Sequence, residues 1–324
     1  MNKLSFNLGT LGIEAADTPL AVGHVALANE GAMAASFLSE PLTDYAAGWK
    51  SDDGKLEALL KFMAPGVRVA PRFEYKKANN GDEFAMIADD KDVRTLYGEY
   101  ALVKSIGETV NAKTVSKGLS TVIEKDSEQP GDREAKVAWL KRLLMRAECL
   151  RAFTLLNGAA TNSAKTWGSS ATPDVDILAA IGAFGDAVGV DGNRVLFGST
   201  AWQKRIGAYA AQAQSHFAVP ATMEALADFL GVDGCLKSTE RYTSGSGKSK
   251  IVSANLVLVF AGQANASVDD FSTAKRFWTP KQGGSEYVTF VDEITNPELV
   301  KITVAHRSQI ALTCSTGVQK LTIS

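Results

Sequence analysis

The strongest helical pattern in the chain lies in residues 130–158, which read PGDREAKVAWLKRLLMRAECLRAFTLLNG. Acidic Asp132 and Glu134 lie near its positive end, and Asn157-Gly158 closes it. At about 1.5 Å per residue such a helix spans roughly 40 Å, longer than a typical globular helix. The stretch therefore predicts one long helix that serves as the structural spine of the molecule.

The apolar residues of this segment recur at the spacing of one helix face. They are Val137, Leu140, Leu143, Leu144, Ala147, Leu150 and Phe153. Lys141, Arg142 and Glu148 are predicted to fall mostly away from that face. Arg151 intrudes on it, so the stripe is imperfect.

Upstream, residues 67–124 predict a long two-stranded excursion with a charged tip. Apolar and polar residues alternate from Val67 to Tyr75, as in a strand with one solvated face, and Pro71 indicates an edge position. A polar segment at 76–82 precedes further extended stretches at 97–106 and 115–123. Because an isolated hairpin is marginally stable in water, we expect this one to lie on a partner.

Residues 1–50 are rich in Gly, Ala and Ser and predict an extended arm, whose apolar residues indicate that it lies on something, such as a neighbouring subunit. A short amphipathic helix is expected at 52–63. Downstream of the spine, helices alternate with strands, which predicts a layered α/β lobe. The expected helices are 175–188, 200–214 and 221–230, and the expected strands are 194–197, 251–260, 287–291, 300–305, 310–314 and 319–323.

Composition narrows the class of protein. The chain has 324 residues, 45% hydrophobic and 22% charged, so we expect a globular protein of two lobes or one elongated subunit. A net charge of -2 argues against a dedicated nucleic-acid binder, which needs clustered cations. No basic segment followed by an apolar one opens the chain, and no apolar run approaches the length of a membrane span, so we expect folding in a cytoplasm.

Residues that could support catalysis or metal binding are scattered. Cys149, Cys235 and Cys314 form no metal-ligand spacing, and we expect them to be small buried hydrophobes. No catalytic serine motif accompanies the three histidines, His24, His216 and His306, and His306 is expected in a polar stretch after a strand. The acid pairs Asp52-Asp53, Asp89-Asp90 and Asp269-Asp270 are interpreted as caps of turns and helices. We therefore predict no catalytic, cofactor-binding or metal site.

Each of two other segments has two possible interpretations. Residues 245–249, GSGKS, are similar to the end of a phosphate-binding loop, but they lead into a strand, so a flexible surface loop is expected. Residues 274–278, AKRFW, place two cations beside two aromatics, which could stack on bases but more often dock a subunit edge. The aromatics Trp202, Phe229, Phe271, Phe277 and Trp278 are interpreted as core and interface anchors.

The order of these elements resembles the Hong Kong 97-like fold of tailed-phage major capsid proteins. Three local patterns carry the resemblance: residues 67–75 (VRVAPRFEY), residues 194–198 (RVLFG) followed by Trp202, and the closing strands at 299–304 and 310–312. The resemblance implies an α+β fold with an N-arm, an extended β-hairpin E-loop, a peripheral (P) domain containing the spine helix, and an α/β axial (A) domain.

The resemblance also divides the chain. Residues 1–66 would be the arm and short helix, 67–124 the E-loop and P-domain strands, and 125–170 the spine and a link. Residues 171–280 would be the A domain and 281–324 the returning strands. Because the E-loop strand begins at Val67, no long N-terminal scaffolding segment fits. Lys76 and Lys77 lie near the expected loop tip, yet nothing identifies the Lys–Asn cross-links of some members, and none is expected.

The resemblance implies a non-enzymatic protein that self-assembles, through pentamers and hexamers, into the icosahedral head shell around a phage genome. Implied partners are a separate scaffolding protein, a portal, decoration proteins, and packaged double-stranded DNA, which is contacted non-specifically. The implied location is the virion capsid, after assembly in the host cytoplasm, with no membrane partner. Two alternatives stay open: an encapsulin-like nanocompartment shell subunit, and an α/β nucleotide-binding enzyme that uses residues 245–249.

Overall fold

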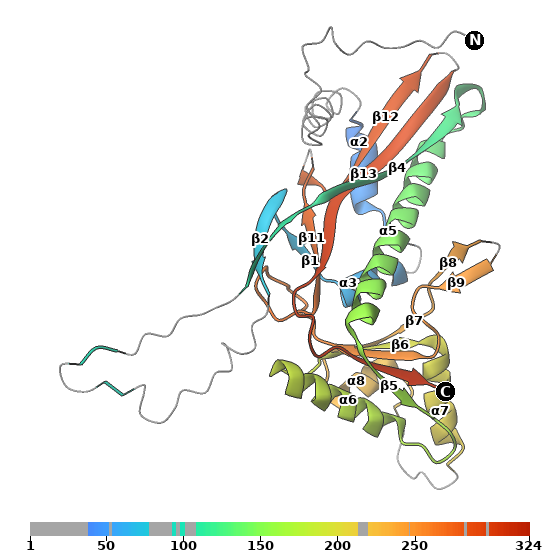
Figure 1. Ribbon diagram of the computed structural model, residues 1–324. Helices are drawn as coiled ribbons and strands as arrows, with labels where there is room; N and C mark the ends of the chain where they lie inside the picture. The colour runs from blue at the N-terminus through green and yellow to red at the C-terminus, as the bar shows by residue number, and fades with distance from the viewer. Residues whose placement is uncertain are drawn as a thin grey trace, which may run out of the picture.

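The computed structural model describes residues 38–51, 54–77, 93–94, 98–100, 108–212, 220–245, 247–281, 284–295 and 298–324. Two five-stranded sheets carry the fold, and two two-stranded ladders extend from them. The first sheet and the helix α5 make an elongated upper body, and the second sheet with three helices makes a lower lobe (Figure 1).

The predicted spine is confirmed as α5 (Asp132–Ala159). Gly131 precedes it with a positive φ of 92°, a conformation that glycine adopts without strain. Its buried residues differ from the predicted stripe, because Lys141 and Glu148 are buried while Leu143, Ala147 and Leu150 are only partly covered. The prediction for those two charged residues was therefore wrong, and the reason lies in the polar partners described below.

The first sheet lies against α5. Its strands run in the order β1 (Gly66–Arg68), β11 (Ala274–Thr279), β13 (Leu299–Leu312), β12 (Tyr287–Ile294), and β4 (Val115–Glu124) pairs with the other edge of β13. Strand β13 joins the two strands expected at 300–305 and 310–314 into one of 14 residues. It is continuous because β4 pairs with its first ten residues and β11 with its last six.

The strand expected at 67–75 is interrupted. Its first part is β1, which pairs in parallel with β11, and its second part is β2 (Arg72–Lys76), which pairs with β3 (Thr109–Lys113) in a separate ladder. Pro71 lies between the two parts, where a residue without an N–H loses no ladder bond. The predicted alternation holds, since Val67 and Tyr75 are buried while their polar neighbours are exposed.

Two short helices cover the spine from the N-terminal side. The helix expected at 52–63 is α3 (Lys55–Met63), and it buries Leu56, Leu59, Leu60 and Met63 against α5. Residues 40–48 form α2 (Glu40–Gly48) in place of the end of an extended arm, with a proline in its first turn and Leu42 and Ala46 buried. Residues 1–37, the rest of the expected arm, lie outside the described residues.

The lower lobe is the expected α/β lobe. Its sheet has the order β5 (Thr161–Lys165), β14 (Gln319–Ile323), β10 (Leu256–Phe260), β6 (Arg194–Gly198), β7 (Gly234–Ser238). The central strand β10 is entirely buried, as predicted, although it is shorter than the expected 251–260. Helices α6 (Pro173–Val188), α7 (Ser199–Ala210) and α8 (Met223–Leu230) pack on one face of this sheet.

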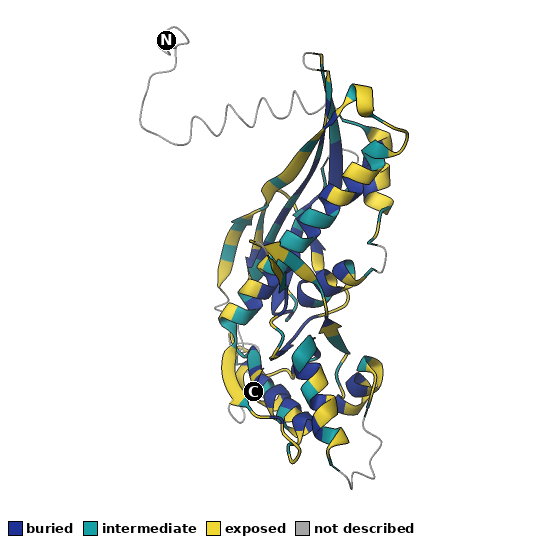
Figure 2. Cartoon of the chain, turned by 90° about the vertical axis from the view of Figure 1, so that its right-hand side faces the viewer, coloured by how far each residue is buried: buried dark blue, intermediate teal, exposed yellow. Residues whose placement is uncertain are grey.

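Buried residues run between α5 and the first sheet and continue into the lower lobe (Figure 2). One hydrophobic cluster joins α2, α3, α5, β4 and β13 to residues of β6 and β10. The body and the lower lobe are thus connected through a shared core.

Candidate functional site

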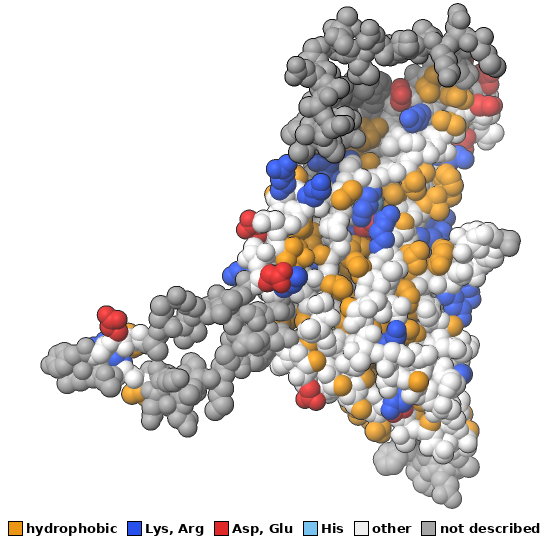
Figure 3. Space-filling model, in the orientation of Figure 1, with side chains coloured by type: hydrophobic (Ala, Val, Ile, Leu, Met, Phe, Trp, Pro, Cys, Tyr) orange, Lys and Arg blue, Asp and Glu red, His pale blue; other side chains and the backbone are white. Residues whose placement is uncertain are grey.

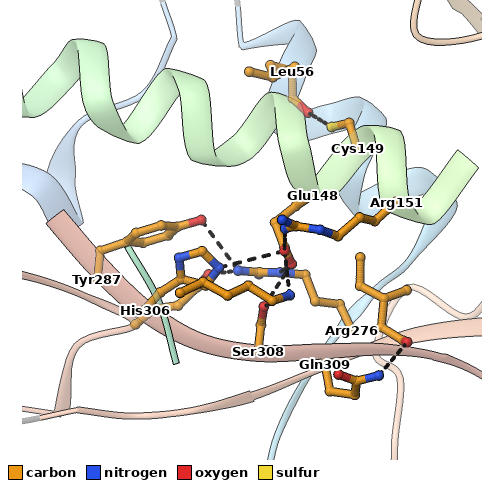
Figure 4. A network of polar contacts seen from close by, with 12 residues as sticks. Leu56, Glu148, Cys149, Arg151, Arg276, Tyr287, His306, Ser308 and Gln309 are labelled. Atoms are coloured by element: carbon orange, nitrogen blue, oxygen red, sulfur yellow. Dashed lines mark hydrogen bonds and ion pairs between the residues drawn. The ribbon is translucent and has the colours of Figure 1, made fainter. Parts of the chain in front are cut away.

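A charged network lies buried between α5 and the first sheet (Figure 4). Its centre is Glu148 of α5, whose side chain is 0% exposed. Oε1 of Glu148 accepts hydrogen bonds from Nζ of Lys117 in β4 at 2.7 Å and from Nη1 of Arg151 at 2.6 Å. Oε2 accepts from Oγ of Ser308 in β13 at 2.8 Å and from Nε of Arg276 in β11 at 3.3 Å. One carboxylate therefore holds three strands to the helix.

Charge compensation makes this burial possible, since a buried carboxylate without partners is expensive. Burial alone would raise the pKa of Glu148, but the neighbouring His306 together with the cations of Lys117 and Arg276 outweighs burial and holds that pKa well below its ordinary value. Burial likewise lowers the pKa of Lys117, against the opposing effect of Glu148. Arg276 also bonds Glu286 and lies 3.4 Å from Oη of Tyr287, so the guanidinium bridges two carboxylates.

His306 borders this network and is 0% exposed. It lies inside β13, opposite Lys117 of β4 and Tyr287 of β12, so the expectation of a polar stretch after a strand was wrong. Its Nε2 lies 3.8 Å from Oε1 of Glu148, within ion-pair range but too far for a hydrogen bond, and neither ring nitrogen has a hydrogen-bond partner among the described residues. Burial lowers the pKa of His306, so the ring is neutral at neutral pH.

Residues 274–278 form most of β11, a strand that the sequence reading missed. Lys275 and Arg276 are buried, so neither cation stacks on a base or docks an outer edge, and both earlier interpretations were wrong. Nζ of Lys275 donates to the carbonyl oxygens of Val268 and Asp270 at 2.9 and 2.7 Å. The strand looks polar in sequence because of these two cations, yet it lies inside the sheet because polar partners satisfy both of them.

The β2–β3 ladder is the base of the predicted excursion. Its register runs from Arg72 opposite Lys113 to Lys76 opposite Thr109, which confirms two antiparallel strands. The ladder is anchored on β11 by aromatic contacts, because the ring centroid of Phe277 lies 4.6 Å from Phe73 and 5.3 Å from Tyr75. Strand β4 is not part of the excursion, since it pairs with β13.

Most of the excursion beyond this base lies outside the described residues, including its expected tip. Lys76 and Lys77 are at the base and not near the tip, because Lys77 donates its N–H to Glu108 and its Nζ lies 2.8 Å from that carboxylate. The earlier placement of these two lysines was wrong. It failed because 30 residues separate Lys77 from Glu108, its hydrogen-bonded neighbour across the ladder.

Residues 245–249 do not form a phosphate-binding loop. Gly245 lies in the turn of a hairpin made of β8 (Arg241–Ser244) and β9 (Gly247–Lys250), and residues 247–249 belong to its second strand. Gly245 takes a φ of 58°, and Nζ of Lys248 donates to Oγ1 of Thr243 across the hairpin. Because β9 leads to the strand β10 and not to a helix, no helix N-terminus faces this loop.

The fold does not bring the other candidate residues together into one site. Cys149 and Cys314 are buried, Cys235 is partly buried, and burial raises the pKa of the Cys149 and Cys235 thiols to about 12. Asp270 accepts hydrogen bonds from the N–H groups of Ser267 and Ser272, which confirms its predicted capping role. His24, His216 and the acid pairs at 52–53 and 89–90 lie outside the described residues. In the described part of the chain, no group of three or more His, Cys, Asp or Glu residues could hold a metal ion.

The chain shares its fold with a phage-related protein. That protein, from Bordetella bronchiseptica, superposes with a TM-score of 0.65 at 15% identity, over 88% of this chain and 96% of the other. The predicted α+β, Hong Kong 97-like fold is confirmed. No family model matches the sequence, and no curated protein matches it.

Structures described as capsids and encapsulins are also similar to the chain. The capsid of cyanophage P-SCSP1u has a TM-score of 0.47 at 9% identity, over 82% of this chain and 87% of the other. The SrpI encapsulin of Synechococcus elongatus PCC 7942 has a TM-score of 0.40 at 11% identity, over 79% and 84%.

No helix in the described part of the chain is long and apolar enough to cross a membrane.

Proposed function

We propose that this chain is the major capsid protein of a tailed phage, a subunit that assembles with copies of itself into the icosahedral shell around the genome. In this proposal its role is structural and not enzymatic. The likeness of fold to a phage-related protein supports it, although a fold alone does not determine a function.

The observation that carries the proposal is the β2–β3 ladder. It is a two-stranded element beside the body, and it rests on β11 through one small apolar cluster, in which Phe73 and Tyr75 contact Phe277, and through a few hydrogen bonds such as the one between Thr114 and Thr279. A two-stranded ladder gains little stability by itself in water. In a shell, a neighbouring copy of the subunit supplies the surface against which such a ladder can pack.

Strand β4 supports the same conclusion. It pairs on one side with β13, and in the described part of the chain no strand pairs with its other side. Val115, Leu119 and Val122 on this strand are exposed. An unpaired strand edge with exposed apolar side chains is suited to contact another chain, and a subunit that works alone would need to protect it.

The domains and partners belong to the same proposal. We assign the first sheet with α5 to the P domain and the lower lobe to the A domain; β5 and β14 enter the lobe from outside the expected limits of 171 and 280. Proposed partners are other copies in pentamers and hexamers, a scaffolding protein, a portal, decoration proteins and packaged DNA. The proposed location is the virion capsid, assembled in the host cytoplasm.

Electron microscopy of the purified chain tests the proposal. We expect uniform hollow particles, and light scattering should give a mass of many subunits. A monomer or dimer under all conditions of salt, pH and crowding would contradict it. Particles that enclose a co-expressed protein cargo in place of DNA would favour the encapsulin alternative.

Deletion of residues 1–37 gives a second test. The shortened chain should keep its circular dichroism spectrum and unfolding midpoint but lose most of its particles, because the arm is proposed to contact neighbours.

The nucleotide-binding alternative predicts nucleotide affinity that Lys248→Ala abolishes. Since Lys248 lies in a hairpin, we expect that neither the wild-type chain nor the Lys248→Ala variant binds nucleotide.

A further inference from the structure

The exposed face of α6 has the composition of a buried surface. Val175 and Leu178 are 60% and 43% exposed, and Ala179, Gly182 and Ala183 continue the same face at helical spacing. The opposite face packs Ile177, Ala180, Ile181 and Phe184 into the lower lobe. A helix that is apolar on both faces is normally covered on both.

The C-terminal end of this face is negatively charged. Asp186 lies exposed in the last turn of α6, Asp191 is exposed just beyond it, and residues 173–193 contain no lysine or arginine. The last turn has no basic residue, although the helix dipole favours a cation there. Neither carboxylate forms an ion pair within the described residues. A cation from another molecule would satisfy both the dipole and the acids.

The β8–β9 hairpin carries the opposite charge. Arg241 and Lys248 are exposed on it and Lys237 is exposed just before it, while Glu240 is the one acid between residues 237 and 250. Neither Arg241 nor Lys237 has an ion-pair partner among the described residues. The hairpin projects from the molecule as an isolated pair of strands (Figures 1 and 3).

Hairpin and helix lie on different sides of the subunit, with α6 along the lower lobe and the hairpin projecting from the opposite side (Figure 1). We propose that the β8–β9 hairpin of one copy docks on the exposed face of α6 in the next copy. The stems of Lys248 and Arg241 would cover Ala179, Gly182 and Ala183, while their charged ends reach Asp186 and Asp191.

Such a contact joins two different patches, so every copy added presents a new hairpin and a new α6 face. Contacts of this kind build closed rings when the rotation between successive copies closes, as a shell of pentamers and hexamers requires. The inference rests on the proposed shell function and names the surface that joins neighbouring subunits. DNA is the less suitable occupant of the hairpin, because three exposed cations displace few phosphate counterions.

Charge reversal tests the contact. Arg241→Glu with Lys248→Glu, and separately Asp186→Lys with Asp191→Lys, should each raise the protein concentration needed for particle formation at least about tenfold. The combined four-substitution chain restores opposite charges at every contact and should recover particles. The control Glu224→Lys with Asp228→Lys changes two exposed acids of α8 in the same lobe and should leave assembly unchanged. Circular dichroism and unfolding midpoints identify any variant that fails to fold.

A cross-link gives an independent readout. Lys248→Cys with Asp186→Cys should form disulfides between subunits under oxidation, giving a ladder of oligomers in denaturing gels, and either cysteine alone should not. If the wild-type chain forms particles and both reversals assemble normally, or the four-substitution chain fails although folded, the hairpin contact is wrong and the shell function stands. The same holds if reversal lowers only DNA content. If the wild-type chain never forms particles, the proposed function itself is wrong.

Discussion

Nζ of Lys117 in β4 lies 2.7 Å from Oε1 of Glu148 in α5, and the Glu148 side chain is fully buried. This pair joins the edge strand of the first sheet to the spine helix across its core. Arg276 of β11 and Ser308 of β13 also donate hydrogen bonds to the Glu148 carboxylate. The cluster fixes how the sheet and the helix sit on each other, so its loss should affect the whole body of the molecule.

Glu148→Gln should lower the free energy of unfolding by ~3–5 kcal/mol, because it leaves the partly buried Lys117 without its counter-charge and removes one of the two carboxylates that the buried Arg276 bridges. Urea unfolding followed by circular dichroism measures this. Glu124→Gln is the matched control, since Glu124 is exposed on β4, and a change within about 0.5 kcal/mol is expected there. Equal effects of the two substitutions would show that the cluster does not stabilise the body.

The neutral state of His306 predicts acid sensitivity. Its pKa is lowered from 6.5 in the folded chain, chiefly by burial, so the unfolded chain binds the proton more readily. Stability should therefore be constant above pH ~6.5 and fall below it, by up to about 1.4 kcal/mol per pH unit. Glu148 has the same sign, but its contribution begins to be lost only near the ordinary carboxylate range.

His306→Gln removes this titration. Urea unfolding at pH 7.5, 6.5, 5.5 and 5.0 should show a flatter profile for His306→Gln than for the wild-type chain, while any effect of His24 and His216 cancels in the comparison. Parallel profiles would mean that His306 takes up its proton as easily in the folded chain as in the unfolded one.

The three thiols should be unreactive in the native chain. Burial raises the pKa of Cys149 and Cys235 to about 12 and also raises that of Cys314, so little thiolate is present at pH 8. A chromogenic disulfide reagent should modify the native protein slowly and all three cysteines after denaturation. Fast modification of a thiol in the native chain would contradict the buried placement, and mass spectrometry would identify it.

Much of the fold was predictable because it rests on local patterns. The spine has a helical repeat that begins after Gly131, although the helix continues through Asn157-Gly158, its predicted end, to Ala159. In the closing strand β13, Val300, Ile302 and Val304 alternate with more polar residues, as a strand with one buried face requires. Strands β5, β7, β8, β9 and β11 and helix α2 were missed. In β11 the cations Lys275 and Arg276 looked solvated, and only the folded chain brings Asp270, Glu148 and Glu286 to them.

The buried charge cluster could not be predicted for the same reason. Lys117, Arg276 and Ser308 lie 31, 128 and 160 residues from Glu148 along the chain. Helical periodicity assigns a lone glutamate to the solvent side, because a buried carboxylate is stable only where partners from other elements meet it. The one local sign was Arg151, which broke the predicted stripe and bonds Glu148.

Lys141 provides the test of how α2 is held. Its Nζ donates to the carbonyl oxygens of Ala46 and Trp49 at 2.5 and 2.6 Å, at the C-terminal end of α2. Lys141→Met keeps the apolar stem and removes both bonds, so stability should fall by ~1–3 kcal/mol. Because the lost bonds end on α2, hydrogen exchange should accelerate first at residues 42–49. Lys136→Met is the control, since Lys136 is exposed on the same helix, and it should leave that exchange unchanged. Unchanged protection of α2 in Lys141→Met would show that Leu42 and Ala46, buried in the core, hold this helix without the lysine.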